Sequence, residues 1–465
     1  MRPRLVFLTG AALALSGCTM IPKYARPEPP VPPSWPESTA PSATAPGLAA
    51  AETPWQQFFT DRRLAGVIEL SLQNNRDLRV AALTVEQMQA FYRIQRSPLF
   101  PTFGVLATGE KVRIPAKETD EGVAKTTTAY TVNVGTSSWE LDLFGRIRSL
   151  KAAALEQYLA TQHARRAAQI SLVAAVASDW LALAADAESL ELARATLEAQ
   201  QASYELIQKS RDAGIGSDLE LRQAQTQVET ARAALAAFTG QIAVDRSTLD
   251  VLAGTTVPSD LLPDRLGDMT AARLLSPGLP SEVLLSRPDI LVAEHRLKAA
   301  NANIGAARAA FFPRISLTAA VGTMSGELSS LFGAGTGTWT FVPQIAAPLF
   351  TGGFNKANLD AATIDREIAV AQYEKAIQGA FAEVTSGLTL RTTLVAQREA
   401  QQALVDALSE AYRLSDARYK AGIDSYLAVL VAQRSQFAGQ QALINVRFAE
   451  QANLVTLYKV LGGGV

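Results

Sequence analysis

Cys18, the only cysteine in the 465-residue chain, is the residue with the most distinctive chemistry. It ends the sequence LSGC and follows Arg2, Arg4 and an apolar run from Leu5 to Leu15, an order that is typical of a secretory signal peptide. LSGC looks like a bacterial lipobox, so the sequence predicts a signal peptide over 1–17 and a covalent lipid on Cys18. A single cysteine excludes an internal disulfide and a cysteine zinc cluster.

Residues that could support catalysis are few. His163 and His295 are the two histidines, and both fall inside helical patterns. His295 follows Glu294, but adjacent residues on a helix point in different directions. The chain has no HExxH or GxSxG motif, and its Gly-rich stretch at 333–337 lacks the Lys-Ser/Thr of a phosphate loop. We therefore expect no enzyme, no catalytic or metal site, and no cofactor beyond the lipid on Cys18.

The overall charge also limits the possible partners. The formal net charge is −1, so no global field attracts nucleic acid, and we expect no nucleic-acid partner. Residues 22 to 54 contain ten of the 22 prolines among Ser, Thr and Ala, a composition that cannot pack a core of its own. We interpret residues 18–54 as a lipid anchor followed by an extended strap.

Two proline-free spans, 116–257 and 349–465, are rich in strong helix formers. In the first span, an apolar residue recurs every seven positions, which favours left-handed coiled-coil packing. These residues are Val176, Leu183, Leu190, Leu197 and Tyr204. Each span also contains one turn signal, and the two signals match at a constant offset of 208, for example at Gly214 and Gly422. The sequence predicts one long helical hairpin per span, over about 149–253 and 354–461.

A second duplication precedes each hairpin. Asp77 and Asp289 lie the same distance before a Phe-Pro, which ends at Pro101 and Pro313. Segments with period-two character follow, and they predict strands over about 102–117, 128–143, 314–324 and 338–350, the last one interrupted by Pro343. We divide the chain into two structural repeats, 55–265 and 266–465.

Four strands without covering helices cannot form a stable sheet in lipid, because their open edges leave backbone groups unpaired. No apolar run of about 20 residues follows the N-terminus, so strands are the better candidates to cross a membrane. If three chains share one barrel, the assembly has 12 strands and 12 long helices. The predicted fold is therefore mainly α with a small membrane β-barrel, in which a trimer joins a 12-stranded β-barrel to a 12-helix α-barrel.

Several motifs resemble the TolC family of outer-membrane factors. They are the duplicated Asp to Phe-Pro element, the segment WELDLFGR at 139–146, the segment AQYEKA at 371–376 and the closing LGGG at 461–464. The lipobox, followed by Thr19, is most similar to the NodT/OprM type of outer-membrane efflux lipoprotein. The resemblance covers the chain after Cys18. It implies a homotrimeric exit channel of a tripartite multidrug efflux pump, with a periplasmic adaptor and an inner-membrane RND transporter as partners.

The resemblance also implies roles for individual residues. Contacts among Asp186, Asp245, Arg418 and Tyr419 would latch the periplasmic end of the channel shut. Leu427, Val431 and Arg434 match the constriction of the pore, where Val431 replaces an acidic residue of the family pattern. This departure puts an aspartate ring in doubt for this chain. The turns at Gly214, Ile215, Ser217, Gly422, Ile423 and Ser425 would dock the adaptor.

Other functions fit parts of the same pattern. Within the channel class, the alternatives are an outer-membrane component for type I protein secretion or for metal-ion efflux. Outside it, a periplasmic coiled-coil scaffold lipoprotein would explain the long helices but has no use for four strands with Gly/Ser-rich loops. For a channel we expect the outer membrane as location, with a large periplasmic portion.

Overall fold

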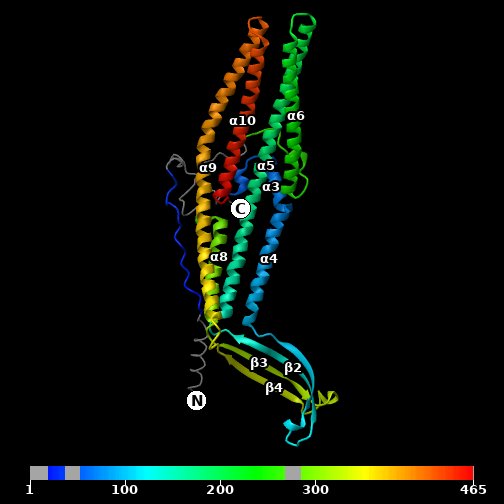
Figure 1. Cartoon of the computed structure of the whole chain (residues 1–465), viewed down its shortest axis with the longest axis vertical. Helices are drawn as coiled ribbons and strands as arrows, with labels where there is room; N and C mark the ends of the chain where they lie inside the picture. The colour runs from blue at the N-terminus through cyan, green and yellow to red at the C-terminus, as the bar shows by residue number, and fades with distance from the viewer. Residues whose placement is uncertain (1–18, 37–52, 268–283, 464–465) are drawn as a thin grey trace. The chain divides into compact units, whose positions relative to one another are not determined.

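The computed structural model describes residues 19–36, 53–267 and 284–463. Cys18 and the predicted lipobox lie outside these residues. The long helices are α4 (Arg76–Arg96), α5 (Arg146–Asp212), α6 (Asp218–Ala253), α8 (Pro288–Ala309), α9 (Phe354–Lys420) and α10 (Tyr426–Val460) (Figure 1). Shorter helices include α2 (Trp55–Phe58) and α3 (Arg62–Asn74), and the strands are β1 (Gly104–Ile114), β2 (Lys125–Leu141), β3 (Arg314–Ser325) and β4 (Gly337–Ala346).

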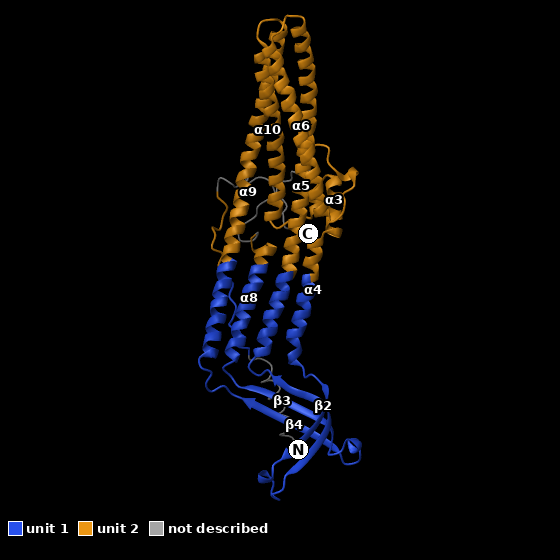
Figure 2. Cartoon of the chain, turned by 45° about the vertical axis from the view of Figure 1, so that its right-hand side comes forward, with its two compact units in different colours: residues 1–27, 84–161, 292–373 blue, residues 28–83, 162–291, 374–465 orange. Residues whose placement is uncertain are grey.

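The contacts divide the chain into two compact units (Figure 2). Unit 1 comprises residues 1–27, 84–161 and 292–373, and unit 2 comprises residues 28–83, 162–291 and 374–465. These units cut across the two sequence repeats, since each repeat contributes two strands and the start of its long helix to unit 1 and the rest of its helical hairpin to unit 2. The repeats describe how the chain is duplicated, whereas the units describe how it packs.

Helices α5 and α9 each contain 67 residues, roughly 100 Å of helix. No proline interrupts them, and glycines in the left-handed conformation follow them, Gly214 with φ 74° and Gly422 with φ 73°. The predicted hairpins over 149–253 and 354–461 correspond to α5 with α6 and α9 with α10. Each repeat thus supplies one long helix and one shorter return helix.

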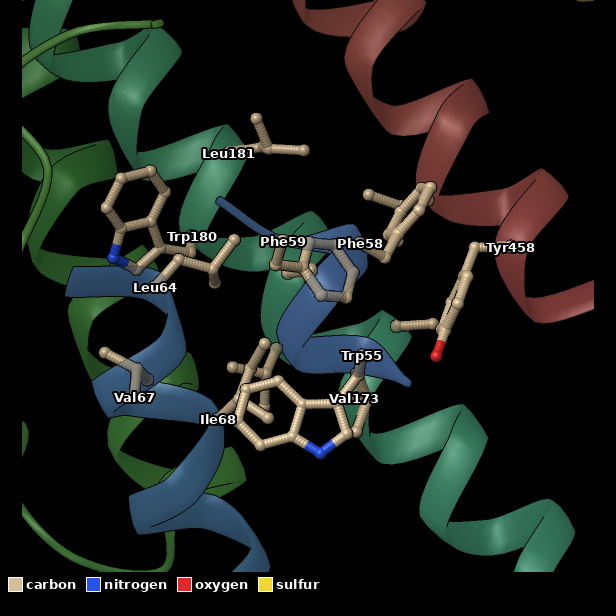
Figure 3. Packing of buried hydrophobic residues seen from close by; sticks show 14 of the residues in the cluster. Trp55, Phe58, Phe59, Leu64, Val67, Ile68, Val173, Trp180, Leu181 and Tyr458 are labelled. Carbon is tan, nitrogen blue, oxygen red and sulfur yellow. The ribbon is translucent and has the colours of Figure 1, made fainter. Parts of the chain in front are cut away.

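Unit 2 contains the main hydrophobic core, built where α2 and α3 pack against α5 and α10 (Figure 3). Phe58 stacks on Tyr458 with ring centroids 4.4 Å apart, and the Trp180 indole N–H donates to the Leu261 carbonyl at 2.9 Å. Val176 and Leu183 of the predicted heptad seam are buried in this core. The short helices α2 and α3 therefore help to cover the apolar seam of α5.

One window of α5 has a mean hydropathy of 1.5 and is long enough to cross a membrane. Among the described helices only α5 has such a stretch, and 56% of that stretch is buried inside the chain. Apolar residues of α5 pack into the core of unit 2, which gives its composition a structural reason.

Unit 1 contains one antiparallel sheet with the order β1-β2-β3-β4 among the described residues. Its outer strands, β1 and β4, each have one edge that pairs with no other strand in the described ranges. Pro343 lies in β4, where proline is tolerated because the strand is at an edge. The register of β2 against β3 shifts between Thr136 and Trp139, where Ser138 has a positive φ of 51°. This bulge bends β2 close to the start of α5.

The N-terminal strap lies against α8 within unit 1. Arg26 binds Glu294 through Nη2 and Oε2 at 2.8 Å, and Tyr24 donates to the same carboxylate at 3.3 Å. Glu294 is 2% exposed and also binds Lys298 at 3.0 Å. Burial opposes its ionisation, but hydrogen bonds from Lys298 and Arg26 outweigh burial and hold the pKa of Glu294 below its ordinary value. The strap thus supplies a positive charge, that of Arg26, and a hydrogen bond from Tyr24 to the buried carboxylate of Glu294.

Two further contacts fix the register of the strap on α8. The Asn301 side chain donates to the Pro22 carbonyl at 2.8 Å, and a Cβ at Gly305 would collide with Ile21 and Ser149. Glu294, Lys298, Asn301 and Gly305 recur at helical spacing, so they form one stripe along α8. Although the sequence predicted an extended strap, it did not indicate this docking stripe.

We expect Arg26→Ala to lower the free energy of unfolding by about 1–3 kcal/mol, because it leaves a buried carboxylate with fewer partners. The double variant Arg26→Ala/Glu294→Gln should recover at least half of that loss. Thermal unfolding of the detergent-solubilised protein measures both, and exposed Lys23→Ala in the same strap is the control. A double variant that is no more stable than Arg26→Ala would contradict this role.

Candidate functional site

The two hairpin turns are the first part of the predicted site. Ile215 and Ile423 follow the left-handed glycines and are 85% and 64% exposed. Ser217 caps α6 in a reciprocal pair with Glu220, whereas the Ser425 side chain makes no capping bond at α10. Each turn therefore presents an exposed isoleucine directly after its left-handed glycine. Such a surface can dock a partner helix, and docking of an adaptor stays a prediction.

Each turn is braced by an arginine that reaches across it. Arg211 binds Asp218 at 2.9 Å in the first turn, and Arg418 binds Asp424 through two hydrogen bonds in the second. The backbone N–H of Ile423 also donates to the Arg418 carbonyl at 3.0 Å. The hydrogen bonds from Arg418 hold the pKa of Asp424 below its ordinary value. Arg418 thus has a local partner within its own hairpin.

An apolar cluster joins the two hairpins just behind the turns. Its buried members come from α5, α6 and α10, and they include Ile207, Leu221 and Tyr426. Tyr419 packs against this cluster, with its ring 5.4 Å from that of Tyr426. Burial raises the pKa of Tyr426 to about 12, so its hydroxyl stays neutral. The predicted gate residue Tyr419 is therefore part of the contact between hairpins.

Asp186 and Asp245 meet elsewhere, between α5 and α6. Asp245 is 6% exposed, and Gln241 donates to its Oδ1 at 2.8 Å. Burial, the hydrogen bond to Asp245 and the charge of Asp245 raise the pKa of Asp186 to about 6. Burial and the charge of Asp245 raise the pKa of Asp179, one heptad earlier on α5, to about 6. Asp179, Asp186 and Asp245 thus form one cluster of carboxyl groups.

Within the chain, the structure places the four predicted latch residues in two separate groups, and the latch itself stays a prediction. Gln441 and Arg447 of α10 bond to Ser189 and Glu188, which are close to Asp186 on α5. These α10 residues lie 15 and 21 positions beyond Tyr426, at the start of the helix, so they are roughly 22–32 Å from the turn beside Arg418. Asp186 and Asp245 therefore do not pair with Arg418 or Tyr419 within the chain. The residue types and the family pattern identified the four residues but did not predict how far apart they lie along the helices.

The predicted constriction residues share one stripe of α10. Leu427 and Val431 are 53% and 55% exposed, and Arg434, one turn further on, is exposed as well. Val429, Leu430 and Gln433 on the opposite side are buried against the other helices. The spacing and exposure suit a surface that faces an open space, but a pore role stays a prediction.

Sequence reasoning missed Asp179 and the charges that surround the strap. Asp179 and Asp186 are seven residues apart, a signal that a search for carboxyls on one helix face could have found. His295 contacts Glu156 at 2.6 Å, so it is part of an ordinary helix-to-helix pair. No group of three His, Cys, Asp or Glu side chains in the described part of the chain could hold a metal ion.

The carboxyl cluster predicts how stability depends on pH. Because the pKa values of Asp179 and Asp186 are near 6 in the folded state and near 3.8 in the unfolded chain, folding takes up protons between these values. The stabilisation from this proton uptake is complete below pH 3.8, declines as the pH rises from 3.8 to 6 and is lost above 6, so part of it remains at pH 5. We expect the thermal midpoint to fall by a few degrees from pH 5 to 7.5, as about 1 kcal/mol would produce.

Asp186→Asn should remove much of this fall, because an amide does not titrate, while exposed Asp260→Asn is the matched control. Differential scanning calorimetry of each variant at the two pH values measures the difference. An unchanged pH dependence in Asp186→Asn would show that the cluster does not titrate in this range.

The chain matches known proteins over most of its length. The sequence model of the family described as outer membrane efflux protein matches residues 67–255 and 279–463. The chain is 47% identical over 465 residues to the toluene efflux pump outer membrane protein TtgC of Pseudomonas putida, covering 100% of this chain and 96% of that protein. It is 41% identical over 454 residues to outer membrane protein OprJ of Pseudomonas aeruginosa, with coverage of 97% and 94%.

The fold has matches among solved structures as well. The open state of the Neisseria gonorrhoeae MtrE outer membrane channel superposes with a TM-score of 0.87 at 39% identity, covering 96% of this chain and 98% of that one. The predicted family, its mainly helical fold with a small sheet and its outer-membrane location are confirmed by these matches. The chain belongs to the outer membrane efflux protein family, as an outer-membrane channel with a large periplasmic helical portion.

Proposed function

We propose that this protein is the passive exit duct of a tripartite multidrug efflux pump and works as a homotrimer. A periplasmic adaptor and an inner-membrane RND transporter would supply docking, substrate choice and energy. The observation that carries the proposal is that unit 1 has two unpartnered sides in the described part of the single chain. On each side, an edge strand and an outer helix are exposed. The family is one of channels rather than enzymes, which agrees with a role in passage and not in chemistry.

The incomplete edges belong to the sheet and to the helices alike. The four-stranded sheet ends at β1 and β4, and the helices of unit 1 lie side by side in the order α4, α5, α8, α9 (Figure 2). No residue of α4 is buried, and Phe91 and Ile94 on it are 50% and 58% exposed. On α9, Ile364 and Ile368 are 53% and 50% exposed. Head-to-tail contacts between copies would cover both edges and close a ring.

A threefold ring satisfies the physical requirement that open strand edges impose in lipid. Three copies give 12 strands, and β4 of one copy would pair with β1 of the next. The same rotation would bring α9 of one copy beside α4 of its neighbour. A lipid on Cys18 would be attached two residues before Met20, whose carbonyl accepts a hydrogen bond from Arg308 of α8 at 3.5 Å.

The two groups of predicted latch residues suggest two separate controls along the duct. Rotation about an axis that runs along the helices does not change height, so a trimer would also keep Asp186 apart from Arg418. We place one control at the turns, where Arg418 and Tyr419 hold the second hairpin. The other would be the carboxyl cluster of Asp186 and Asp245, which fixes α5 against α6. Leu427, Val431 and Arg434 would line the narrow part between subunits.

If the controls are separate, their free-energy effects on channel opening should add. We expect Asp186→Ala and Arg418→Ala each to raise the open fraction in planar bilayers, and the double variant to match the sum within about 0.5 kcal/mol. The double variant Arg418→Ala/Asp424→Ala is the matched comparison. These two residues are in contact, so the free-energy effects of their substitutions should not be additive. A coupling above about 1 kcal/mol between Asp186 and Arg418 would restore the single latch.

The trimer itself can be tested apart from the docking turns. Phe91→Asp with Ile94→Asp should reduce the trimer fraction seen by light scattering, because charge would be buried between α4 and its neighbour. Ile215→Asp with Ile423→Asp should leave trimers and conductance intact but lose capture of the purified adaptor. Trimers of normal stability in the α4 variant would contradict this use of the edge.

A further inference from the structure

Unit 1 contains a cavity of about 690 Å³ where the starts of α5, β3 and α9 meet α8 and the end of β4. This volume is in the range that holds a drug-sized molecule. Small and apolar side chains form its wall, among them Ala306, Ala310, Phe312, Phe354 and Ala361. The side chain of Asn355 donates to the Ala310 carbonyl at 3.0 Å and ties α9 to α8 beside this wall. The packing of α8 and α9 thus defines the shape of this cavity.

The strand pairing determines which face of the sheet the cavity adjoins. Ile315, Leu317 and Val321 lie opposite Ile345, Pro343 and Trp339, so one face of the sheet is apolar. Arg314 and its partner Ala346 belong to the other face, with Ser316, Thr318 and Gln344. In a membrane barrel the apolar face meets lipid and the polar face meets the lumen. The cavity therefore opens towards the lumen, an assignment that rests on the proposed function.

The charges in the cavity are separated along its length. Arg146 at one side is already neutralised, because it binds Glu140 through two hydrogen bonds at 2.9 and 2.7 Å. Arg314 begins β3, and Asp365 lies three turns into α9, about 16 Å of helix beyond Phe354. In the described residues neither Arg314 nor Asp365 has an ion pair. A free cation and a free carboxylate thus face an apolar wall from different ends.

We propose that this cavity is a lumenal binding site for amphipathic zwitterions. The carboxylate of the ligand would meet Arg314, its ammonium would meet Asp365, and its apolar body would lie on the alanine wall. A ligand with both charges is favoured because each end of the cavity offers one opposite charge. Both protein charges are exposed to solvent, so binding is weak and reversible, as a duct requires.

The probe is 11-aminoundecanoic acid, which carries a carboxylate and an ammonium at opposite ends of an apolar chain. Undecanoic acid and undecylamine each keep one of the charges and are the matched ligands. Isothermal titration of the trimer in lipid nanodiscs, with empty nanodiscs as reference, measures affinity without depending on the gate. We expect Arg314→Gln and Asp365→Asn each to weaken binding of the zwitterion about tenfold.

The single-charge ligands separate the two ends of the site. Arg314→Gln should weaken undecanoic acid and leave undecylamine unchanged, and Asp365→Asn should do the reverse. Arg366→Gln, a change on α9 at a residue that does not line the cavity, is the control, and Ala306→Trp should abolish binding by filling the space. Equal affinity in wild type and Ala306→Trp would overturn the proposal.

An absence of heat for all three ligands, with trimers intact by light scattering and conducting in bilayers, would also overturn it. That result would mean that a neighbouring subunit fills the cavity. Loss of trimers in the wild-type preparation would instead contradict the proposed function, so the two failures are distinguishable.

Discussion

An open strand edge in lipid is the constraint on which the rest of this structure depends. Each unpaired N–H or C=O in the hydrocarbon region costs several kcal/mol, so a four-stranded sheet with free edges cannot persist there alone. The outer helix α4 likewise lacks a covering partner within the described part of the chain, since none of its residues is buried. In the proposed trimer, neighbouring copies would complete the sheet, and the exposed apolar side chains of α4 and α9 would lie in the contacts between subunits.

Much of the fold followed from patterns that are local in the sequence. Proline-free spans, the glycines of the turns and the Phe-Pro boundaries determine where helices and strands begin and end, because each acts through the backbone of a few residues. The strand β4 was predicted although Pro343 interrupts its alternation, and the position of β4 at the sheet edge explains why the proline is tolerated. The spacing of the duplicated segments also gave the two hairpins.

The site could be predicted only in part, because local sequence patterns do not determine which residues of different helices lie close together. The family pattern identified Asp186 and Arg418, yet the structure places them at different levels of unit 2 and gives each a nearer partner. Asp179 and the Glu294 contacts escaped for the same reason. A buried carboxylate is recognised by what surrounds it in space, and for Glu294 the surroundings include a strap 268 residues away in sequence.

That distance has a consequence for the order in which the chain matures. The strap is among the first segments to leave the ribosome, but its docking stripe on α8 begins at Glu294, so the stripe emerges only after the whole first repeat. Until then the strap has no place to bind, and an enzyme that attaches lipid near its start would meet a free segment. The contacts between the strap and α8 can therefore form only after α8 of the second repeat has been synthesised.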